Sequence, residues 1–163
     1  MNFPMEMHDP ALAAKPGDLL ASYKNLPECF KEYNHYWFYG WAVSDEDMKR
    51  YHKVVNVKDN PGPSSGWPFH AWTITQLSVR SGYEHISYFL GKPDEKSSEK
   101  AITANEGEKA VRVLASSCSK SNRLFWMRPT EKQMERLINI IGEEPRWVMD
   151  FYTKKDFRFD WLQ

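Results

Sequence analysis

The sequence predicts an α/β or α+β fold: a single domain with a four- to five-stranded mixed sheet and helices packed on both of its faces. The first observation behind this prediction is residues 36–43, Tyr-Trp-Phe-Tyr-Gly-Trp-Ala-Val, the most aromatic and apolar stretch of the chain. Alternate side chains of a strand point to opposite faces, so Trp37, Tyr39 and Trp41 would share one face. Because neither face is polar, we expect an interior strand covered on both sides.

Two further observations support this fold class. Apolar content is 41% and aromatic content is 15% of the 163 residues, which is typical of a chain with a real core. Helix-like and strand-like spacings of apolar residues also alternate along the chain, as expected for crossover helices between strands. The length favours one domain. We therefore predict an irregular arm at 1–17 and one globular α/β domain at 18–163.

The elements before the aromatic strand are short. Prolines and a Pro-Gly pair interrupt residues 1–17, which explains the predicted arm. Asp18 can cap a helix that runs to about residue 25. Pro27 suits the first turn of a second short helix that carries Cys29.

The next elements follow the aromatic strand. One serine and three acidic residues predict the start of a helix at about 45–55, because acids are favoured at a helix amino terminus. Its inward residues would be Met48, Tyr51, His52 and Val55. Residues 60–68 are rich in proline and glycine and predict a loop. Residues 69–81 fit a strand or a helix, and the flanking Pro68 and Gly82 favour the helix.

The second half of the chain begins with a predicted strand at 84–90. The spacing of the apolar residues in 106–118 predicts a helix with an inward face of Ala110, Val113, Leu114 and Cys118. A short strand is predicted at 123–128.

The clearest element is a helix at about 130–141. Thr130 and Gln133 form a capping box, four apolar residues repeat along one helix face, and Gly142 can end the helix in the left-handed conformation. Two strands complete the prediction, at 146–152 and, with alternating charges and rings, at 156–161.

Charge and composition exclude several function classes. Lys plus Arg equals Asp plus Glu, at 22 each, so no net field attracts nucleic acid or an anionic membrane. The longest apolar run is far short of a membrane-spanning helix, and the amino terminus does not resemble a signal peptide. Two cysteines, Cys29 and Cys118, are few for a secreted scaffold. We therefore expect a cytoplasmic protein, with nucleic-acid binding unlikely and no membrane association.

The common motifs for cofactors, metals and nucleophiles do not predict a site. Gly62-Pro-Ser-Ser-Gly66 matches the nucleophile-elbow pattern, but its prolines and the missing Ser, acid, His order favour a loop. The five histidines are scattered, and no phosphate-binding loop, Cys-x-x-Cys or His-Glu-x-x-His occurs. We expect no cofactor and no metal.

Two groups of residues remain as site candidates. His35 lies beside the aromatic strand and His85 begins the strand predicted at 84–90, so they would converge with Tyr39 if the two strands were neighbours. Trp37, Tyr39 and Trp41 would form a stacking platform if they were exposed. Scattered surface histidines and core-filling rings are the more ordinary interpretations of these patterns.

The leading hypothesis is an intracellular non-catalytic binding or interaction domain. It would bind a protein partner or another copy of itself through its C-terminal strand, where Phe157, Phe159 and Trp161 alternate with charges. The alternative is a small cofactor-independent enzyme, in which a His/carboxylate acid–base pair acts on a small metabolite beside an aromatic pocket. His35 and His85 are its catalytic candidates, and Trp37, Tyr39 and Trp41 are its ligand-binding candidates.

Overall fold

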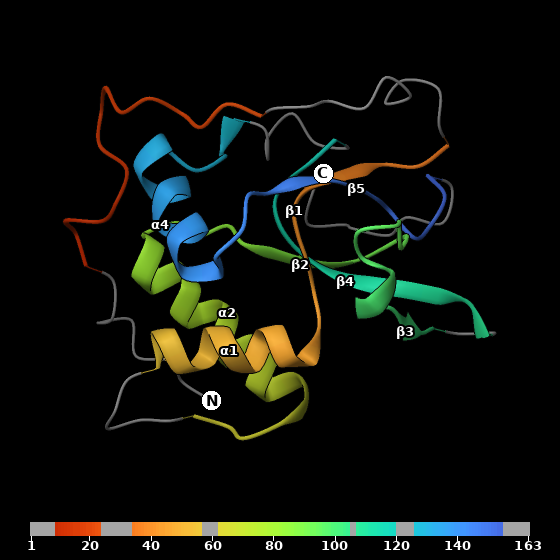
Figure 1. Cartoon of the computed structure of the whole chain (residues 1–163). Helices are drawn as coiled ribbons and strands as arrows, with labels where there is room; N and C mark the ends of the chain where they lie inside the picture. Colours follow the sequence, from red (N-terminus) through yellow and green to blue (C-terminus); the bar gives the residue numbers. More distant parts are fainter. Residues whose placement is uncertain (1–8, 24–33, 57–61, 105–106, 120–125, 155–163) are drawn as a thin grey trace. The chain divides into compact units, whose positions relative to one another are not determined.

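The computed structural model describes residues 9–23, 34–56, 62–104, 107–119 and 126–154. Within them it contains three α-helices and five β-strands, so the predicted α+β class with a four- to five-stranded sheet is confirmed (Figure 1). In chain order the elements are β1 (Trp37–Val43), α1 (Asp45–Val55), α2 (Gly66–Ser81), β2 (Ser87–Gly91), the 3-10 helix η3 (Ser98–Lys100), β3 (Ile102–Thr103), β4 (Lys109–Cys118), α4 (Glu131–Ile141) and β5 (Arg146–Met149).

The chain forms two compact units, and each unit is assembled from separate stretches of sequence. The first unit, which we call the helical unit, contains the three α-helices, and its stretches are Met1–Ala21, Glu46–Ile86 and Pro129–Glu143. The second, which we call the sheet unit, contains the five strands, and its stretches are Ser22–Asp45, Ser87–Arg128 and Glu144–Gln163.

The sheet unit is built from antiparallel pairs. The strand order is β2-β4-β1-β5, and the short β3 also pairs with β4. Every pairing between the described strands is antiparallel, whereas the sequence predicted a mixed sheet with crossover helices.

Strand β1 is the interior strand that the aromatic stretch predicts. It pairs with β4 on one side and β5 on the other, and all seven of its residues are buried. Its register with β4 shifts between Tyr39 and Gly40, which leaves Ser116 as an extra residue on β4. The Ser116 hydroxyl donates to the Tyr39 carbonyl over 3.1 Å, so this bulge is held by a side-chain hydrogen bond.

The two edges of the sheet meet at the end of β2. Gly91 forms an antiparallel bridge with Asp150, which directly follows β5. The Lys92 amide donates to the Met149 carbonyl over 2.8 Å, and the Phe151 amide donates to the Leu90 carbonyl over 3.1 Å. The sheet therefore curls until its outer strands bond to each other.

One face of this curled sheet forms an apolar core. The Phe38 and Phe89 rings are stacked with centroids 4.2 Å apart. The remaining buried members of the cluster are aliphatic residues and one cysteine: Ala42, Val111, Val113, Ala115, Cys118 and Val148. Cys118 is thus placed in this core as a small hydrophobic side chain.

The helix predicted at 106–118 is wrong, because Lys109–Cys118 form β4 instead. The spacing of Ala110, Val113 and Leu114 fits a helix face, but β4 has buried residues on both faces. A strand that is covered on both sides loses the apolar–polar alternation that identifies strands. Apolar spacing alone therefore could not separate the two structures here.

The helical unit contains the best-predicted elements. Helix α1 occupies the predicted residues and buries Met48, Tyr51 and Val55, with His52 half-buried. The ambiguous segment 69–81 is helical within α2, which ends at Gly82 in the left-handed conformation.

Helix α4 has the predicted capping box and ends at Gly142 with φ 87°. Helices α2 and α4 lie side by side (Figure 1). The Gln133 side chain joins them, because its Nε2 donates to the Gly82 carbonyl over 2.8 Å.

The short helix predicted from Asp18 is wrong over its described residues, which are not helical. The Leu19–Ala21 backbone instead bonds to the residues that start α4. Ala21 N donates to the Pro129 carbonyl over 2.8 Å, and Glu131 N donates to the Leu19 carbonyl over 2.9 Å. The Asp18 carboxylate accepts from the Lys15 amide rather than capping a helix.

Other predicted elements begin or end differently or were not described. Strand β2 begins at Ser87 rather than at 84, and β5 ends at Met149 rather than at 152. The helix after Pro27 and the strand at 156–161 lie outside the described residues, as does most of the strand at 123–128. No helix in the described part of the chain is long and apolar enough to cross a membrane.

Candidate functional site

The candidate site is a hollow between α1 and the first turns of α2, within the helical unit. Its volume is about 360 Å³, at the small end of the range for ligand pockets. Of the described residues that line it, five come from α1 and one comes from α2: Glu46, Lys49, Arg50, His52, Lys53 and Phe69. We call this the α1–α2 hollow.

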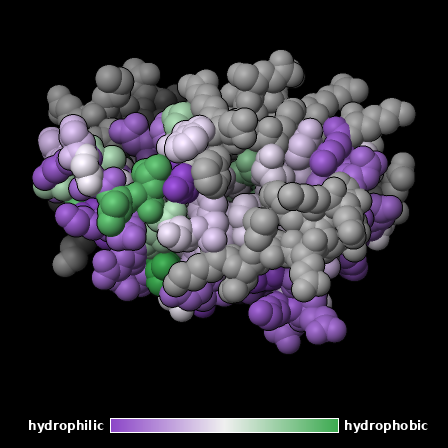
Figure 2. Space-filling model, turned by 90° about the horizontal axis from the view of Figure 1, so that it is seen from above, coloured by the Kyte–Doolittle hydropathy of each residue, from purple (hydrophilic) through white to green (hydrophobic). Residues whose placement is uncertain are grey.

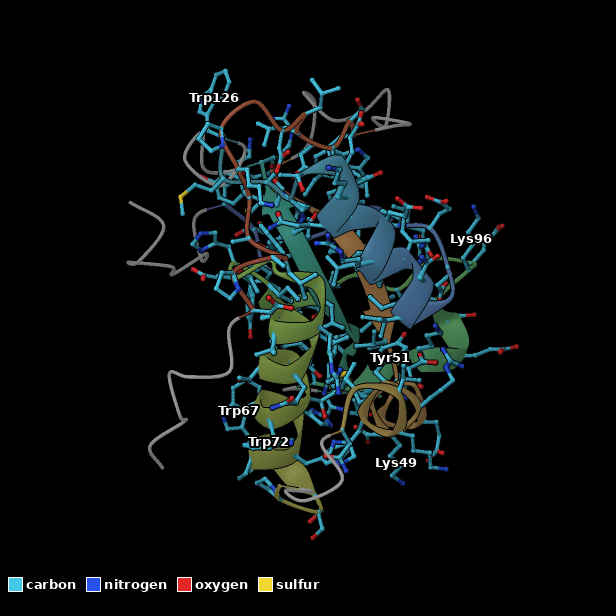
Figure 3. All side chains as sticks on the ribbon, turned by 90° about the vertical axis from the view of Figure 1, so that its left-hand side faces the viewer. Lys49, Tyr51, Trp67, Trp72, Lys96 and Trp126 are labelled. Atoms are coloured by element: carbon cyan, nitrogen blue, oxygen red, sulfur yellow. The ribbon has the colours of Figure 1, made fainter. Side chains whose placement is uncertain are left out.

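The charged side chains of the hollow lie on one face of α1. Residues 46, 49, 50 and 53 are spaced three and four apart, which places them on the same side of a helix. Tyr51 points to the opposite side of α1 from Lys49 (Figure 3) and is fully buried, and burial raises its pKa. The same helix therefore has a core face and a cationic face.

Two of the three cations on this face have an acidic neighbour one turn earlier. Lys49 Nζ lies 3.2 Å from Glu46 Oε1, and Arg50 Nη2 lies 3.1 Å from Asp47 Oδ1. Lys53 has Lys49 and Arg50 at the equivalent positions, and no carboxylate among the described residues forms an ion pair with it. Positive charge is therefore in excess at the carboxyl-terminal end of this face.

The aromatic part of the hollow is held in place by a short hydrogen-bond chain. The buried Thr73 hydroxyl donates to the Phe69 carbonyl over 2.9 Å, and His52 Nδ1 lies 3.3 Å from the same hydroxyl oxygen. Because Thr73 has one hydroxyl hydrogen, His52 Nδ1 must be the donor to it. This fixes the tautomer of a neutral His52, in which Nε2 is the acceptor nitrogen.

The ring of Phe69 packs directly against His52. Their centroids lie 4.8 Å apart with the planes inclined at 49°, one of the tilted arrangements common for ring pairs. Phe69 is 7% exposed, so it contributes an apolar wall among charged neighbours. The hollow thus combines ring surface with cationic groups.

The histidines predicted as a converging pair belong to different units. His35 is in the sheet unit, where its Nδ1 lies 2.8 Å from the Tyr152 carbonyl. His85 is in the helical unit, in the turn before β2, and its ring makes an edge contact with Tyr83 at 5.8 Å. Each histidine is half-buried. Their catalytic role stays a prediction.

The predicted aromatic platform is buried. Trp37, Tyr39 and Trp41 are 8%, 4% and 3% exposed on β1. Tyr39 packs against Tyr23 and Trp147, with centroid distances of 4.4 Å and 5.0 Å. Burial raises the pKa of Tyr23 to about 12, although the nearby Ser117, Ser116 and Arg128 side chains lower it. These rings pack as core residues, as the ordinary interpretation of the pattern expects.

Two further predictions concern partner binding by the C-terminal rings and metal binding. Phe157, Phe159 and Trp161 lie outside the described residues, so their role in partner binding stays a prediction. Within the part of the chain that the structure describes, no three His, Cys, Asp or Glu side chains come close enough to hold a metal ion.

Exposed apolar side chains come from several separate elements. The largest are Leu19, Val54, Trp67, Trp126 and Tyr152. Among the coloured residues of the face in Figure 2, hydrophobic side chains form small areas between hydrophilic ones. The α1–α2 hollow is therefore a more defined candidate than any of these apolar areas.

Sequence reasoning missed the residues of the hollow. The i, i+3, i+4, i+7 spacing of Glu46, Lys49, Arg50 and Lys53 was a usable signal, because it places them on one helix face. Phe69 had no such signal, since it belongs to another helix and its position depends on how the two helices pack.

Comparison with known proteins adds no functional assignment. No protein-family model matches the sequence. No curated protein and no solved structure matches it either. The candidate site therefore rests on its own geometry.

Proposed function

We propose that this chain is a cytoplasmic, non-catalytic binding domain that holds a small acidic ligand in the α1–α2 hollow. The observation that carries the proposal is the excess of cations around that hollow. Lys49, Arg50 and Lys53 line it, and Glu46 is the only acidic residue among the described residues that line it. Like charges three and four residues apart on a helix destabilise it by about 0.2–0.5 kcal/mol per pair. A bound anion relieves that repulsion.

The ion pairs on α1 leave its cations available to a ligand. The side chains of Glu46 and Lys49 are 83% and 61% exposed, and exposed pairs of this kind contribute little to stability. Exchanging Glu46 for a ligand carboxylate or phosphate therefore costs Lys49 little. Arg50 is more restrained, because its guanidinium also lies 5.3 Å from the centre of the Tyr51 ring.

A titration of 15N-labelled protein with inorganic phosphate at constant ionic strength tests this function. We expect saturable shifts of the α1 amides, centred on residues 52 and 53, that are lost in Lys53→Glu. Lys132→Glu is the matched control, because Lys132 is exposed on α4 and does not line the hollow. Linear shifts that are equal in both variants would show that the hollow does not bind anions.

One specific observation supports the alternative that the chain is an enzyme. His52 lies in the hollow with Nδ1 committed to Thr73, so its Nε2 is the nitrogen that can accept a proton from a substrate. His52, rather than His35 or His85, is then the catalytic base of this second candidate function. Turnover of phosphate or carboxylate esters that disappears in His52→Gln would favour the enzyme over the binding domain.

A further inference from the structure

The α1–α2 hollow presents ring surface as well as charge to a ligand, because His52 and Phe69 line it beside the cations. Among the lining residues that the structure describes, only Phe69 has a purely apolar side chain, and it packs against the imidazole of His52. The Phe69 ring also lies 5.8 Å from the ring of His70, the next residue of α2, in a tilted arrangement. A rigid wall of this kind favours a flat partner over a flexible chain, because little freedom is lost on stacking.

The charges are arranged around that wall. Phe69 is supplied by α2, whereas Lys49, Arg50 and Lys53 come from one face of α1. Their long methylene chains can cover apolar ligand surface while the charged ends reach an acidic group. A volume of about 360 Å³ accommodates one small ring compound.

We infer that the α1–α2 hollow binds a small organic anion that consists of a flat ring and one acidic group. The ring packs against His52 and the exposed part of Phe69, and the phosphate or carboxylate contacts Lys53 together with Lys49 or Arg50. This inference rests on the proposed function and adds the chemical class of the ligand. It requires that ring and charge act together, so each alone binds less tightly.

Four probes separate these contributions: phenyl phosphate, benzoate, inorganic phosphate and benzyl alcohol. We expect phenyl phosphate to bind about tenfold more tightly than inorganic phosphate, which is the gain typical of one stacked ring. Benzyl alcohol has the ring without the charge and should bind most weakly. The order of phenyl phosphate and benzoate shows which acidic group the hollow prefers.

Two variants assign the contributions to residues. Phe69→Leu keeps an apolar side chain but removes the ring, so it should reduce phenyl phosphate affinity about tenfold and leave inorganic phosphate affinity unchanged. Lys53→Gln should weaken both phosphates, and the loss should shrink as salt rises. Amide spectra that match the wild type show that both variants are folded.

The outcomes of these experiments distinguish the ring requirement from the proposed anion-binding function. Equal affinity for phenyl phosphate and inorganic phosphate, unaffected by Phe69→Leu, would overturn the ring requirement and leave anion binding intact. If neither phosphate binds in a saturable way, the proposed function and the inference both fail.

Discussion

Asp150 is a buried carboxyl group of the sheet unit. It directly follows β5 and is 1% exposed, and one carboxyl oxygen, Oδ1, accepts from the Tyr152 amide over 3.1 Å. The other, Oδ2, has no hydrogen-bond partner among the described residues. Burial raises the pKa of Asp150 to about 7, and the hydrogen bond from the Tyr152 amide and the charge of Lys92 only partly oppose it. The carboxyl is therefore protonated in the folded protein over a range in which it ionises in the unfolded chain.

Asp150→Asn should make the protein more stable than the wild type at pH 8 but not at pH 4. A group whose pKa is raised by folding stabilises the folded state fully below its unfolded pKa, near 3.8, and loses this contribution as pH rises towards 7. Asparagine stays neutral and its Oδ1 can still accept from Tyr152. Urea unfolding of both proteins from pH 4 to 8 measures the difference in free energy of unfolding. Parallel pH profiles would contradict the prediction.

Gln133 is the side chain that ties together the parts of the helical unit at the start of α4. Its Oε1 accepts from the Thr130 amide over 3.1 Å, which completes the capping box. Its Nε2 donates to the Gly82 carbonyl over 2.8 Å and to the Leu12 carbonyl over 3.3 Å. The helix cap therefore also fixes the end of α2 and the amino-terminal segment.

Gln133→Ala should destabilise the protein more than Thr130→Ala. Loss of a capping hydroxyl costs about 1 kcal/mol, whereas Gln133→Ala removes three hydrogen bonds, on the order of 2 kcal/mol. The Gly82 carbonyl and the Thr130 amide then lose the partner that Gln133 provides, while Arg136 still donates to the Leu12 carbonyl. Thermal or urea unfolding compares the two variants. Equal losses would mean that the contacts to Gly82 and Leu12 contribute no stability.

The helices that were predicted correctly have signals within their own residues. The capping box and Gly142 mark both ends of α4, and Gly82 marks the end of α2. The prediction for β4 was wrong because the strand is defined by its pairing, with β1 on one side and β2 on the other. Burial on both faces removes the period of two, and no residue within β4 replaces that signal.

Only the cationic part of the candidate site could be predicted from the sequence. The cationic face of α1 is visible in the sequence, because helical spacing alone places Lys49, Arg50 and Lys53 together. The hollow itself depends on Phe69 and on the Thr73–His52 contact, which come from the packing of α2 against α1. The spacing within one helix carries no information on that packing.

The two units alternate along the whole chain, so neither is a contiguous piece. Residues 129–143 of the helical unit are joined at both ends to stretches of the sheet unit. If the sheet unit unfolds, those stretches become long flexible loops. Closing these loops to bring the three stretches of the helical unit together costs entropy, which destabilises the helical unit. We therefore expect unfolding of one unit to destabilise the other, as the single domain predicted at 18–163 requires.

Gly40→Ala tests this coupling from within the sheet unit. A Cβ on Gly40 would lie 1.9 Å from the Leu114 carbonyl oxygen and 2.8 Å from Ala115 Cα, so β1 and β4 would have to separate. Such overpacking costs on the order of 3 kcal/mol. Gly107→Ala is the matched control in the same unit, because a Cβ there meets nothing within 4 Å and the left-handed φ costs only about 1 kcal/mol.

Native-state hydrogen exchange measures the opening free energy of amides in both units. If the chain unfolds as one cooperative structure, Gly40→Ala lowers the opening free energy of the slowest α4 amides by the same amount as that of the slowest β4 amides. The control variant lowers both by the smaller amount. Protection of α4 that stays at the wild-type value, while β4 loses its protection, would show that the helical unit remains folded alone.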